Sequence, residues 1–279
     1  MIQRHNTDET TMAYINLYAV LGALENLVQM DEEARALIAD KKISVGFAVA
    51  GGPAATLCFD HGTCTLKSGV ERCDIKLPFS SPAKFNGMID GTVTPIPSKG
   101  FTKIRFLLKD FTRLTDILTR YLRASEEDLK DPEFFRRSTA LMFYTIVSAI
   151  SQIGNHDKVS RTSASYMKDG IIRVAIAGGP VASVCVKDHR LRTVKKAPKA
   201  PDAQMEFGSL QIARDLFDGR VNSLACVGTG DIRMGGMIPL DGTIAEGEVM
   251  LNQASLTGES IPVPKRPGGA VYAGTVVEE

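Results

Sequence analysis

One short stretch near the carboxyl end contains residues whose types and spacing could take part in chemistry. It reads Thr257, Gly258, Glu259 and Ser260, which places a carboxylate beside a glycine and between two hydroxyl groups. Because glycine permits a tight turn, a carboxylate here can approach a phosphoryl group and hold a water molecule in line for attack. The stretch by itself supplies one participant of such a reaction and no complete catalytic set.

The remaining reactive residue types predict neither a metal site nor a cofactor site. The five cysteines include no C-x-x-C pair and no Cys/His pair at zinc spacing. They are best interpreted as small buried apolar side chains. Asp74 and Asp202 each stand at the start of a predicted strand, where a carboxylate more often accepts hydrogen bonds from backbone N–H groups than performs chemistry.

A ten-residue stretch occurs twice in the chain. Residues 50–59 return as residues 177–186, both beginning Ala-Gly-Gly-Pro and both with cysteine in the ninth place. The offset of 127 residues then becomes 128, so that Phe79 matches Phe207 and Gly100 matches Gly228. This internal repeat predicts two copies of one domain, each long enough to have its own core.

Composition limits the class of protein. Hydrophobic residues make up 44% and charged residues 23% of the 279 residues, and the formal net charge is +1. These values are typical of a soluble globular protein and indicate no general affinity for nucleic acid or anionic lipid. No apolar run is long enough for a stable membrane insertion, and no signal peptide is present, so we expect a cytoplasmic protein.

Periodicity predicts the elements of the first copy in the order helix, strands, helix, strand, helix. The first helix spans residues 8–30, and residues 31–40 extend it or form a second helix. Strands are expected at 43–49, 55–60, 63–67, 74–78 and 103–108, with a helix from 81 to 89 and an amphipathic closing helix from 111 to 122. The second copy repeats the plan with a helix at 140–153, strands at 171–177, 182–187 and 190–195, a helix at 209–217 and last strands within 221–234.

After Met234 the parallel between the copies ends. Pro239 and the glycines around it make a closing helix unlikely in the second copy. We therefore expect four segments: a first domain at 1–124, a linker at 125–138, a second domain at 139–238 that lacks its closing helix, and a different C-terminal segment at 239–279.

Residues 12 to about 238 resemble the sterol carrier protein type two family in tandem form. The resemblance rests on the helix–strand–strand order, on Asp74, Leu77 and Phe79 leading into a helix at Ser81, and on the run Met88-Ile89-Asp90-Gly91. It implies an α+β fold, with a small twisted sheet and helices over one face, that binds lipid or another apolar small molecule. No catalytic residue belongs to that family. The candidate residues for lining an apolar site are Phe79, Phe106, Phe111, Leu114, Leu118, Phe207 and Met234.

Residues 238–279 resemble the actuator domain of P-type cation-transporting ATPases, nearest the heavy-metal type. The resemblance rests on Asn252 to Ser260, on Pro262-Val263, and on Val271 to Thr275. It implies that Glu259 orients the water that hydrolyses an aspartyl phosphate, in a loop shaped by Thr257, Gly258 and Ser260. The D-K-T-G phosphorylation motif, the nucleotide domain and the membrane helices of such a pump are missing from the sequence.

Two interpretations of the whole chain therefore remain. In the favoured one, the chain is a non-enzymatic module that binds an apolar small molecule or lipid, without cofactor, metal or nucleic acid, and its C-terminal segment is a short β-rich actuator fragment joined to it. In the alternative, the chain is part of a metal-cation-transporting P-type ATPase, and residues 257–260 are its functional region. The sequence identifies neither the ligand nor the cation, does not decide between a genuine fusion and a join of gene fragments, and leaves the oligomeric state open.

Overall fold

The computed structural model describes residues 8–236, 242–244, 246–252, 262–271 and 276–278. The chain divides into two compact units, each described here by itself. The first unit comprises Met1–Met167 with His189–Arg192, and the second comprises Lys168–Asp188 with Thr193–Glu279. The domain boundaries expected from the sequence, near 124, 138 and 238, stay predictions.

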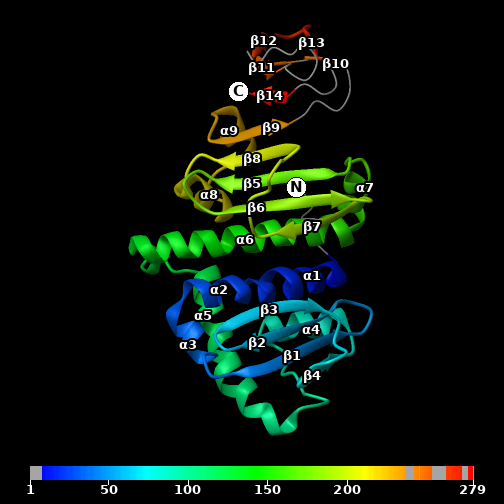
Figure 1. Ribbon diagram of the computed structural model, residues 1–279, viewed down its shortest axis with the longest axis vertical. Helices are drawn as coiled ribbons and strands as arrows, with labels where there is room; N and C mark the ends of the chain where they lie inside the picture. The colour runs from blue at the N-terminus through cyan, green and yellow to red at the C-terminus, as the bar shows by residue number, and fades with distance from the viewer. Residues whose placement is uncertain (1–7, 237–241, 245, 253–261, 272–275, 279) are drawn as a thin grey trace. The chain divides into compact units, whose positions relative to one another are not determined.

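The first unit combines a four-stranded sheet with many short helices (Figure 1). The strands are β1 (Lys42–Val49), β2 (Ala54–Asp60), β3 (Thr63–Ser68) and β4 (Ile75–Phe79). Their order in the sheet is β3-β2-β1-β4, with β1 antiparallel to β2 and parallel to β4. The α-helices are α1 (Glu9–Ile15), α2 (Leu24–Met30), α3 (Glu32–Leu37), α4 (Pro82–Ile89), α5 (Thr112–Leu122), α6 (Pro132–His156) and α7 (Lys158–Ser165). Shorter helical turns are η1 (Asn16–Val20), η2 (Leu21–Ala23), η3 (Phe101–Lys103), η4 (Phe106–Phe111) and η5 (Asp128–Lys130).

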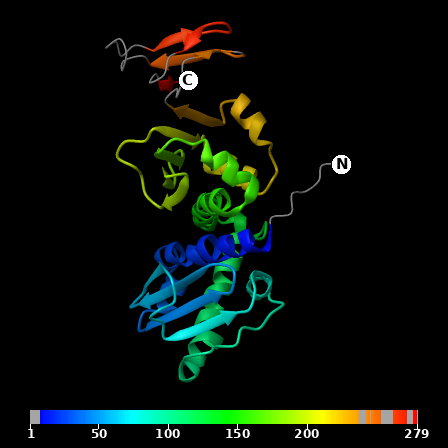
Figure 2. The ribbon, with the colours of Figure 1, turned by 90° about the vertical axis from the view of Figure 1, so that its right-hand side faces the viewer.

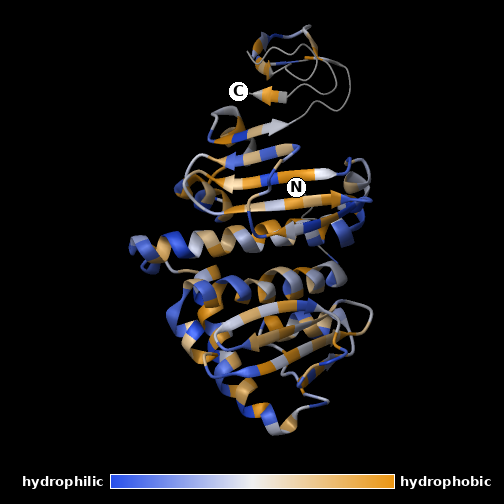
Figure 3. Ribbon diagram, in the orientation of Figure 1, coloured by the Kyte–Doolittle hydropathy of each residue, from blue (hydrophilic) through white to orange (hydrophobic). Residues whose placement is uncertain are grey.

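One face of this sheet builds the core of the first unit. Alternate residues of the paired strands are buried, as the two-residue period of a strand requires. They are Val45, Phe47 and Val49 in β1, Ala55, Leu57 and Phe59 in β2, and Ile75, Leu77 and Phe79 in β4. Apolar residues from α2, α4 and α5 belong to the same core, and Figure 2 shows α5 beside the sheet. The apolar stripe of α5 is visible in Figure 3 as orange segments that alternate with blue ones.

The second unit has a sheet whose strands are ordered and paired much as in the first. The strands of this sheet are β5 (Gly170–Ile176), β6 (Val181–Lys187), β7 (Arg190–Val194), β8 (Ala203–Phe207) and β9 (Ile232–Gly236), of which residues 190–192 are assigned to the first unit; the helices are α8 (Leu210–Phe217) and α9 (Ser223–Gly228). The order is β7-β6-β5-β8-β9. β5 is antiparallel to β6 and parallel to β8, as β1 is to β2 and β4. β9 adds an antiparallel strand at the outer edge of β8.

The repeated Ala-Gly-Gly-Pro stretch forms the same turn in both sheets. Gly51 has a φ of 68° and Gly178 a φ of 65°, in the left-handed region that glycine adopts readily. The amide of Ala50 donates to the carbonyl of Phe79 over 2.9 Å, and the amide of Ala177 donates to that of Phe207 over 2.8 Å. The turn connects β1 to β2 in the first sheet and β5 to β6 in the second. In each sheet, its hydrogen bond also fixes the end of β1 or β5 to the end of the neighbouring parallel strand, β4 or β8.

The C-terminal part consists of short strands. They are β10 (Gly242–Thr243), β11 (Val249–Asn252), β12 (Val263–Lys265), β13 (Ala270–Val271) and β14 (Val276–Glu278). β11 pairs with β12 and β14, and β10 pairs with β13. The predicted fold class, α+β with a short β-rich C-terminal segment, is confirmed.

The structure corrects three predictions about elements. The strand predicted at 103–108 is wrong, because the chain there is helical from Phe101 onward and continues into α5. A short apolar run does not distinguish a strand from a buried helix by itself, and in this helical run Phe106 is buried in the core. Within the last strands predicted at 221–234, residues 223–228 form α9 instead, and the side chain of Asn222 accepts a hydrogen bond from the amide of Ala225 at its start.

The third correction concerns the start of the helix predicted at 140–153. α6 begins at Pro132, because the Asp131 side chain accepts hydrogen bonds from the amides of Glu133 and Phe134 and proline suits the first helical position. The helix predicted at 140–153 is confirmed as the central part of α6. The following α7 has no counterpart among the predicted elements.

Candidate functional site

The residues with the clearest reactive pattern, Thr257, Gly258, Glu259 and Ser260, lie outside the described residues. The role that the actuator resemblance implies for Glu259 therefore stays a prediction. Around this segment, the structure describes β11 and β12, which pair antiparallel from Val249–Lys265 to Leu251–Val263.

Five of the seven candidate lining residues belong to the core of the first unit. They are Phe79, Phe106, Phe111, Leu114 and Leu118. Phe59, Phe106 and Phe111 form a triangle of rings, with centroids separated by 5.4, 6.3 and 6.4 Å. Phe79 packs edge to face against Phe85, with ring centroids 5.2 Å apart. The aromatic candidates therefore pack against other rings of the same core.

The other two candidates belong to the second unit. Phe207 in β8 is buried and packs edge to face on Phe217, with ring centroids 5.6 Å apart. Met234 in β9 stands opposite Met205 and is 50% exposed. The seven candidates are therefore divided between the two units, five in the first and two in the second.

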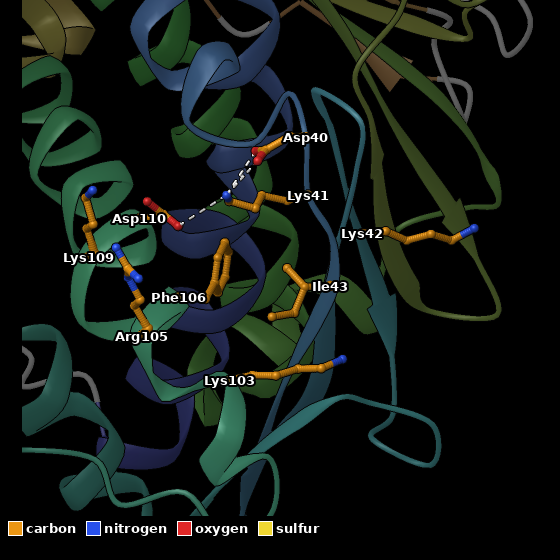
Figure 4. A pocket seen from close by; sticks show the side chains of 9 residues that line it. All are labelled: Asp40, Lys41, Lys42, Ile43, Lys103, Arg105, Phe106, Lys109 and Asp110. Carbon is orange, nitrogen blue, oxygen red and sulfur yellow. Dashed lines mark hydrogen bonds and ion pairs between the residues drawn. The ribbon is translucent and has the colours of Figure 1, made fainter.

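A pocket of about 440 Å³ in the first unit has a mixed lining of charged and apolar residues (Figure 4). Its volume is within the range typical of small-molecule sites. The lining residues are Asp40, Lys41, Lys42, Ile43, Lys103, Arg105, Phe106, Lys109 and Asp110. Phe106 is the one predicted lining residue among them. It belongs both to the aromatic core and to the wall of the pocket.

Two segments far apart in the sequence position these side chains. The first is the turn from α3 into β1, where the carbonyl of Lys41 accepts a hydrogen bond from the amide of His61 over 2.8 Å. The second is the helical run that begins after Gly100. Gly100 has a φ of 88°, and a Cβ there would lie 2.5 Å from the carbonyl oxygen of Asp74. Glycine is therefore required where this run starts against β4.

The helical run is widened beside the pocket. η4 is a π-helical segment, a rare conformation that is frequent at functional sites. The Thr112 hydroxyl donates to the carbonyl of Leu107 over 2.9 Å, in addition to the backbone N–H of Thr112, so this carbonyl of the widened turn accepts from two donors. Arg105 and Lys109 stand four residues apart on the run, a spacing that places two side chains on the same face of a helix.

Asp74 connects the two strands at the edge of the site with this helical run. One of its carboxylate oxygens accepts hydrogen bonds from the backbone amide and the hydroxyl of Ser44, over 2.9 and 2.7 Å. The other accepts from Lys103 Nζ over 2.6 Å. Burial acts to raise the pKa of Asp74, but the hydrogen bonds with Lys103 and Ser44 together hold it below its usual range. Asp202 likewise accepts from the amide of Ile171 over 2.7 Å, so the predicted role of both carboxylates toward backbone N–H groups is confirmed.

Lys41 lies between two carboxylates. Its Nζ is 2.9 Å from Oδ1 of Asp40 and 3.9 Å from Oδ2 of Asp110. The hydrogen bond with Asp40 raises the pKa of Lys41, and the nearby charge of Arg105 acts against that rise. Sequence reasoning missed this site because its two halves lie about sixty residues apart; the signal was the group of cations in residues 41–42 and 103–109.

Neither a metal centre nor a membrane-spanning helix is found in the part of the chain that the structure describes. No group of three or more His, Cys, Asp or Glu side chains there could hold a metal ion. All five cysteines are free thiols. None of the described helices is both long and apolar enough to cross a bilayer.

The C-terminal part of the chain is similar to a known domain family. Residues 224–279 match the P-type ATPase actuator domain. The cadmium/zinc-transporting ATPase HMA3 of Oryza sativa subsp. japonica is 44% identical over 61 residues, and the copper-exporting P-type ATPase B of Archaeoglobus fulgidus is 49% identical over 45 residues. These matches cover 21% and 16% of this chain. In both cases the matched region spans 6% of the length of the relative.

Solved sterol carrier protein 2 domains are structural neighbours of the N-terminal part. Sterol carrier protein 2 from Yarrowia lipolytica matches 33% of this chain and 85% of its own, with 20% sequence identity and a TM-score of 0.25. A TM-score below 0.5 does not establish a shared fold, so the description of the fold rests on the strand order and pairing given above.

Proposed function

We propose that this chain is a non-enzymatic binding module for an amphipathic small molecule, such as a lipid, and that its two sheets belong to two copies of one sterol-carrier-like fold. The observation that carries the binding proposal is the position of Phe106. This side chain connects the aromatic core of the first unit with a pocket that is apolar at Ile43 and Phe106 and charged around them. Such a mixed lining suits a ligand with an apolar part and a polar part.

The proposal of two copies is supported by the shared geometry of the sheets. Strands β3-β2-β1-β4 and β7-β6-β5-β8 have the same order, and the central strand of each has the same pairing sense with its neighbours. The matched glycine turns at Gly51 and Gly178 make equivalent hydrogen bonds. Register and turn geometry specify a sheet closely, so their recurrence supports duplication of one domain.

Titration of the full chain with a fluorescent fatty-acid probe tests the binding proposal. We expect saturable binding that weakens about fivefold in Ile43→Thr, because that change replaces apolar lining by a hydroxyl group. Ile96→Thr is the matched control, since Ile96 is 75% exposed and does not line the pocket. Thermal unfolding of both variants verifies that they are folded. Absence of saturable binding to the unmodified chain would contradict the proposal.

The match of residues 224–279 to the actuator domain favours a second candidate function, as part of a metal-cation-transporting P-type ATPase. In that case Glu259 would act on an aspartyl phosphate that a further segment supplies. Sequencing the transcript through codons 235–245 and beyond codon 279 distinguishes the candidates. A continuing frame with a D-K-T-G motif and long apolar spans supports the pump, and a stop codon or a discontinuity at the junction supports the binding module.

A further inference from the structure

The pocket beside Phe106 carries more positive than negative charge. Five of its nine lining residues are cations, Lys41, Lys42, Lys103, Arg105 and Lys109, and two are carboxylates, Asp40 and Asp110, which leaves an excess of three positive charges. The chain as a whole has a net charge of only +1. Positive charge is therefore concentrated at this pocket, and lining of one sign attracts a ligand of the other.

Two of these cations are directed elsewhere. Lys103 pairs with Asp74 over 2.6 Å. Lys42 acts on Asp60, whose pKa it helps to lower after the larger effect of the His61 hydrogen bond, and Figure 4 shows its side chain pointing away from Lys41, Arg105 and Lys109. These two residues contribute to the general field of the pocket and are not candidates for direct contact with a ligand.

Arg105 and Lys109 are available to a ligand. Among the residues that the structure describes, neither side chain forms a hydrogen bond or an ion pair. Figure 4 shows them beside one another on the helical run, with Lys41 opposite. Their charges have no neutralising partner in this arrangement.

Lys41 is the third available cation. Its contact with Asp110 is long, at 3.9 Å, and its closer partner Asp40 has a side chain that is 77% exposed. Exposed ion pairs of this kind are weak and are screened by salt. A doubly charged anion that reaches Arg105 and Lys109 together can therefore compete with these carboxylates for Lys41.

We propose that the pocket binds the phosphate group of an amphipathic phosphate ester, held by Lys41, Arg105 and Lys109, while its apolar part lies against Ile43 and Phe106. Only the apolar part of this inference rests on the proposed function. A phosphate monoester carries up to two negative charges and several acceptor oxygens, which fit the fork of an arginine and two ammonium groups. The phosphate can come from a lipid headgroup or from free phosphate, and the experiment separates these sources.

The test compares octyl phosphate, octanol and inorganic phosphate as ligands of the full chain by isothermal titration. Octyl phosphate and octanol share the apolar chain and differ in the anion. We expect octyl phosphate to bind about tenfold more tightly than octanol, because charge-assisted hydrogen bonds are the stronger class. Raising the salt concentration should reduce this ratio.

The double variant Arg105→Gln with Lys109→Gln should lose most of that preference while binding octanol as before. The matched control is Lys67→Gln with Lys84→Gln, which removes two exposed cations of the same unit that do not line the pocket. It should keep the tenfold ratio. Both double variants remove two positive charges. A difference between them therefore reflects the position of the charges and not the net charge of the protein.

The outcomes distinguish failure of the anion site from failure of the proposed binding module. Binding of inorganic phosphate that the pocket variant abolishes supports the anion site with free phosphate as the source, even if octanol does not bind at all. Binding that requires the octyl chain and the phosphate together supports a lipid headgroup. Equal affinity for octanol and octyl phosphate, or a ratio that the pocket variant leaves unchanged, overturns the anion site while the binding module stands.

Discussion

At the scale of single residues, Asp74 connects a strand edge with the approach to the pocket. Its two carboxylate oxygens accept from Ser44 in β1 and from Lys103 at the start of the helical run. Lys103 also lines the pocket. Asp74 therefore both links to β1 and positions a lysine in the wall of the pocket.

Replacing Asp74 by asparagine should destabilise the protein in a pH-dependent way. The folded-state pKa of Asp74 is lowered, so the carboxylate contributes stability that is fully present above the unfolded pKa and is lost as the pH falls through the folded pKa. At neutral pH we expect a loss of about 0.5–1 kcal/mol in the free energy of unfolding, because partial exposure screens the pair with Lys103. Urea unfolding of both proteins between neutral and acidic pH measures it.

The control for this prediction is Asp90→Asn, which changes an exposed carboxylate of the same unit. Its free energy of unfolding should follow that of the unmodified protein at every pH. A deficit in Asp74→Asn that persists unchanged into acid, below the folded pKa, would show that the carboxylate charge is not what stabilises this edge.

Single residues also show what sequence reasoning could and could not find. The role of Asp74 and Asp202 was predictable, because a carboxylate at a strand start has few other local partners. The group formed by Lys41, Arg105 and Lys109 was not, because it exists only after β1 and the helical run are brought together. The pocket collects its charges from two segments that are distant in the sequence.

At the scale of elements, most strands of both sheets and the helix α5 were predictable, whereas the helical state of residues 101–110 was not. Residues 45, 47 and 49 of β1 and residues 55, 57 and 59 of β2 follow the two-residue period that a half-buried strand requires. Residues 103–108 have a short apolar run without a distinct period. Their helical state depends on packing of Phe106 and Phe111 against Phe59, which is a long-range contact.

Gly100 and Gly228 occupy matched positions in the repeat, but they should respond oppositely to alanine. Gly100→Ala should destabilise the protein by more than about 2 kcal/mol, because it combines an unfavourable positive φ with a clash against the backbone of Asp74. Gly228→Ala should be neutral or stabilise by up to about 1 kcal/mol, because Gly228 ends α9 and an added Cβ meets no atom within 4 Å.

Chemical unfolding of the two alanine variants measures both effects against the same unmodified protein. Gly91→Ala is a further reference, since Gly91 has a φ of 74° but space for a Cβ, so it isolates the cost of the backbone conformation. Equal destabilisation by Gly100→Ala and Gly91→Ala would contradict the close approach of Gly100 to β4.

At the scale of the whole molecule, the two units combine similar sheets with different continuations. In the first unit the chain continues after Gly100 into η4 and α5, which supply Phe106, Leu114 and Leu118 to the core. In the second unit the chain after the matched Gly228 forms strand β9, and the match to the actuator domain begins just before it, at residue 224 in α9. The repeat in the sequence made the similar sheets predictable. The loss of sequence correspondence after Met234 indicated that the second copy ends differently.

Native mass spectrometry of the full chain, purified without added lipid or detergent, tests the binding proposal most directly. We predict a population whose mass exceeds that of the polypeptide by one intact amphipathic molecule. Organic extraction should remove the added mass and recover the same molecule in the extract, and octyl phosphate added afterwards should restore a bound state. A chain that shows only the polypeptide mass, yields no amphipathic molecule on extraction and takes up no octyl phosphate would contradict the account.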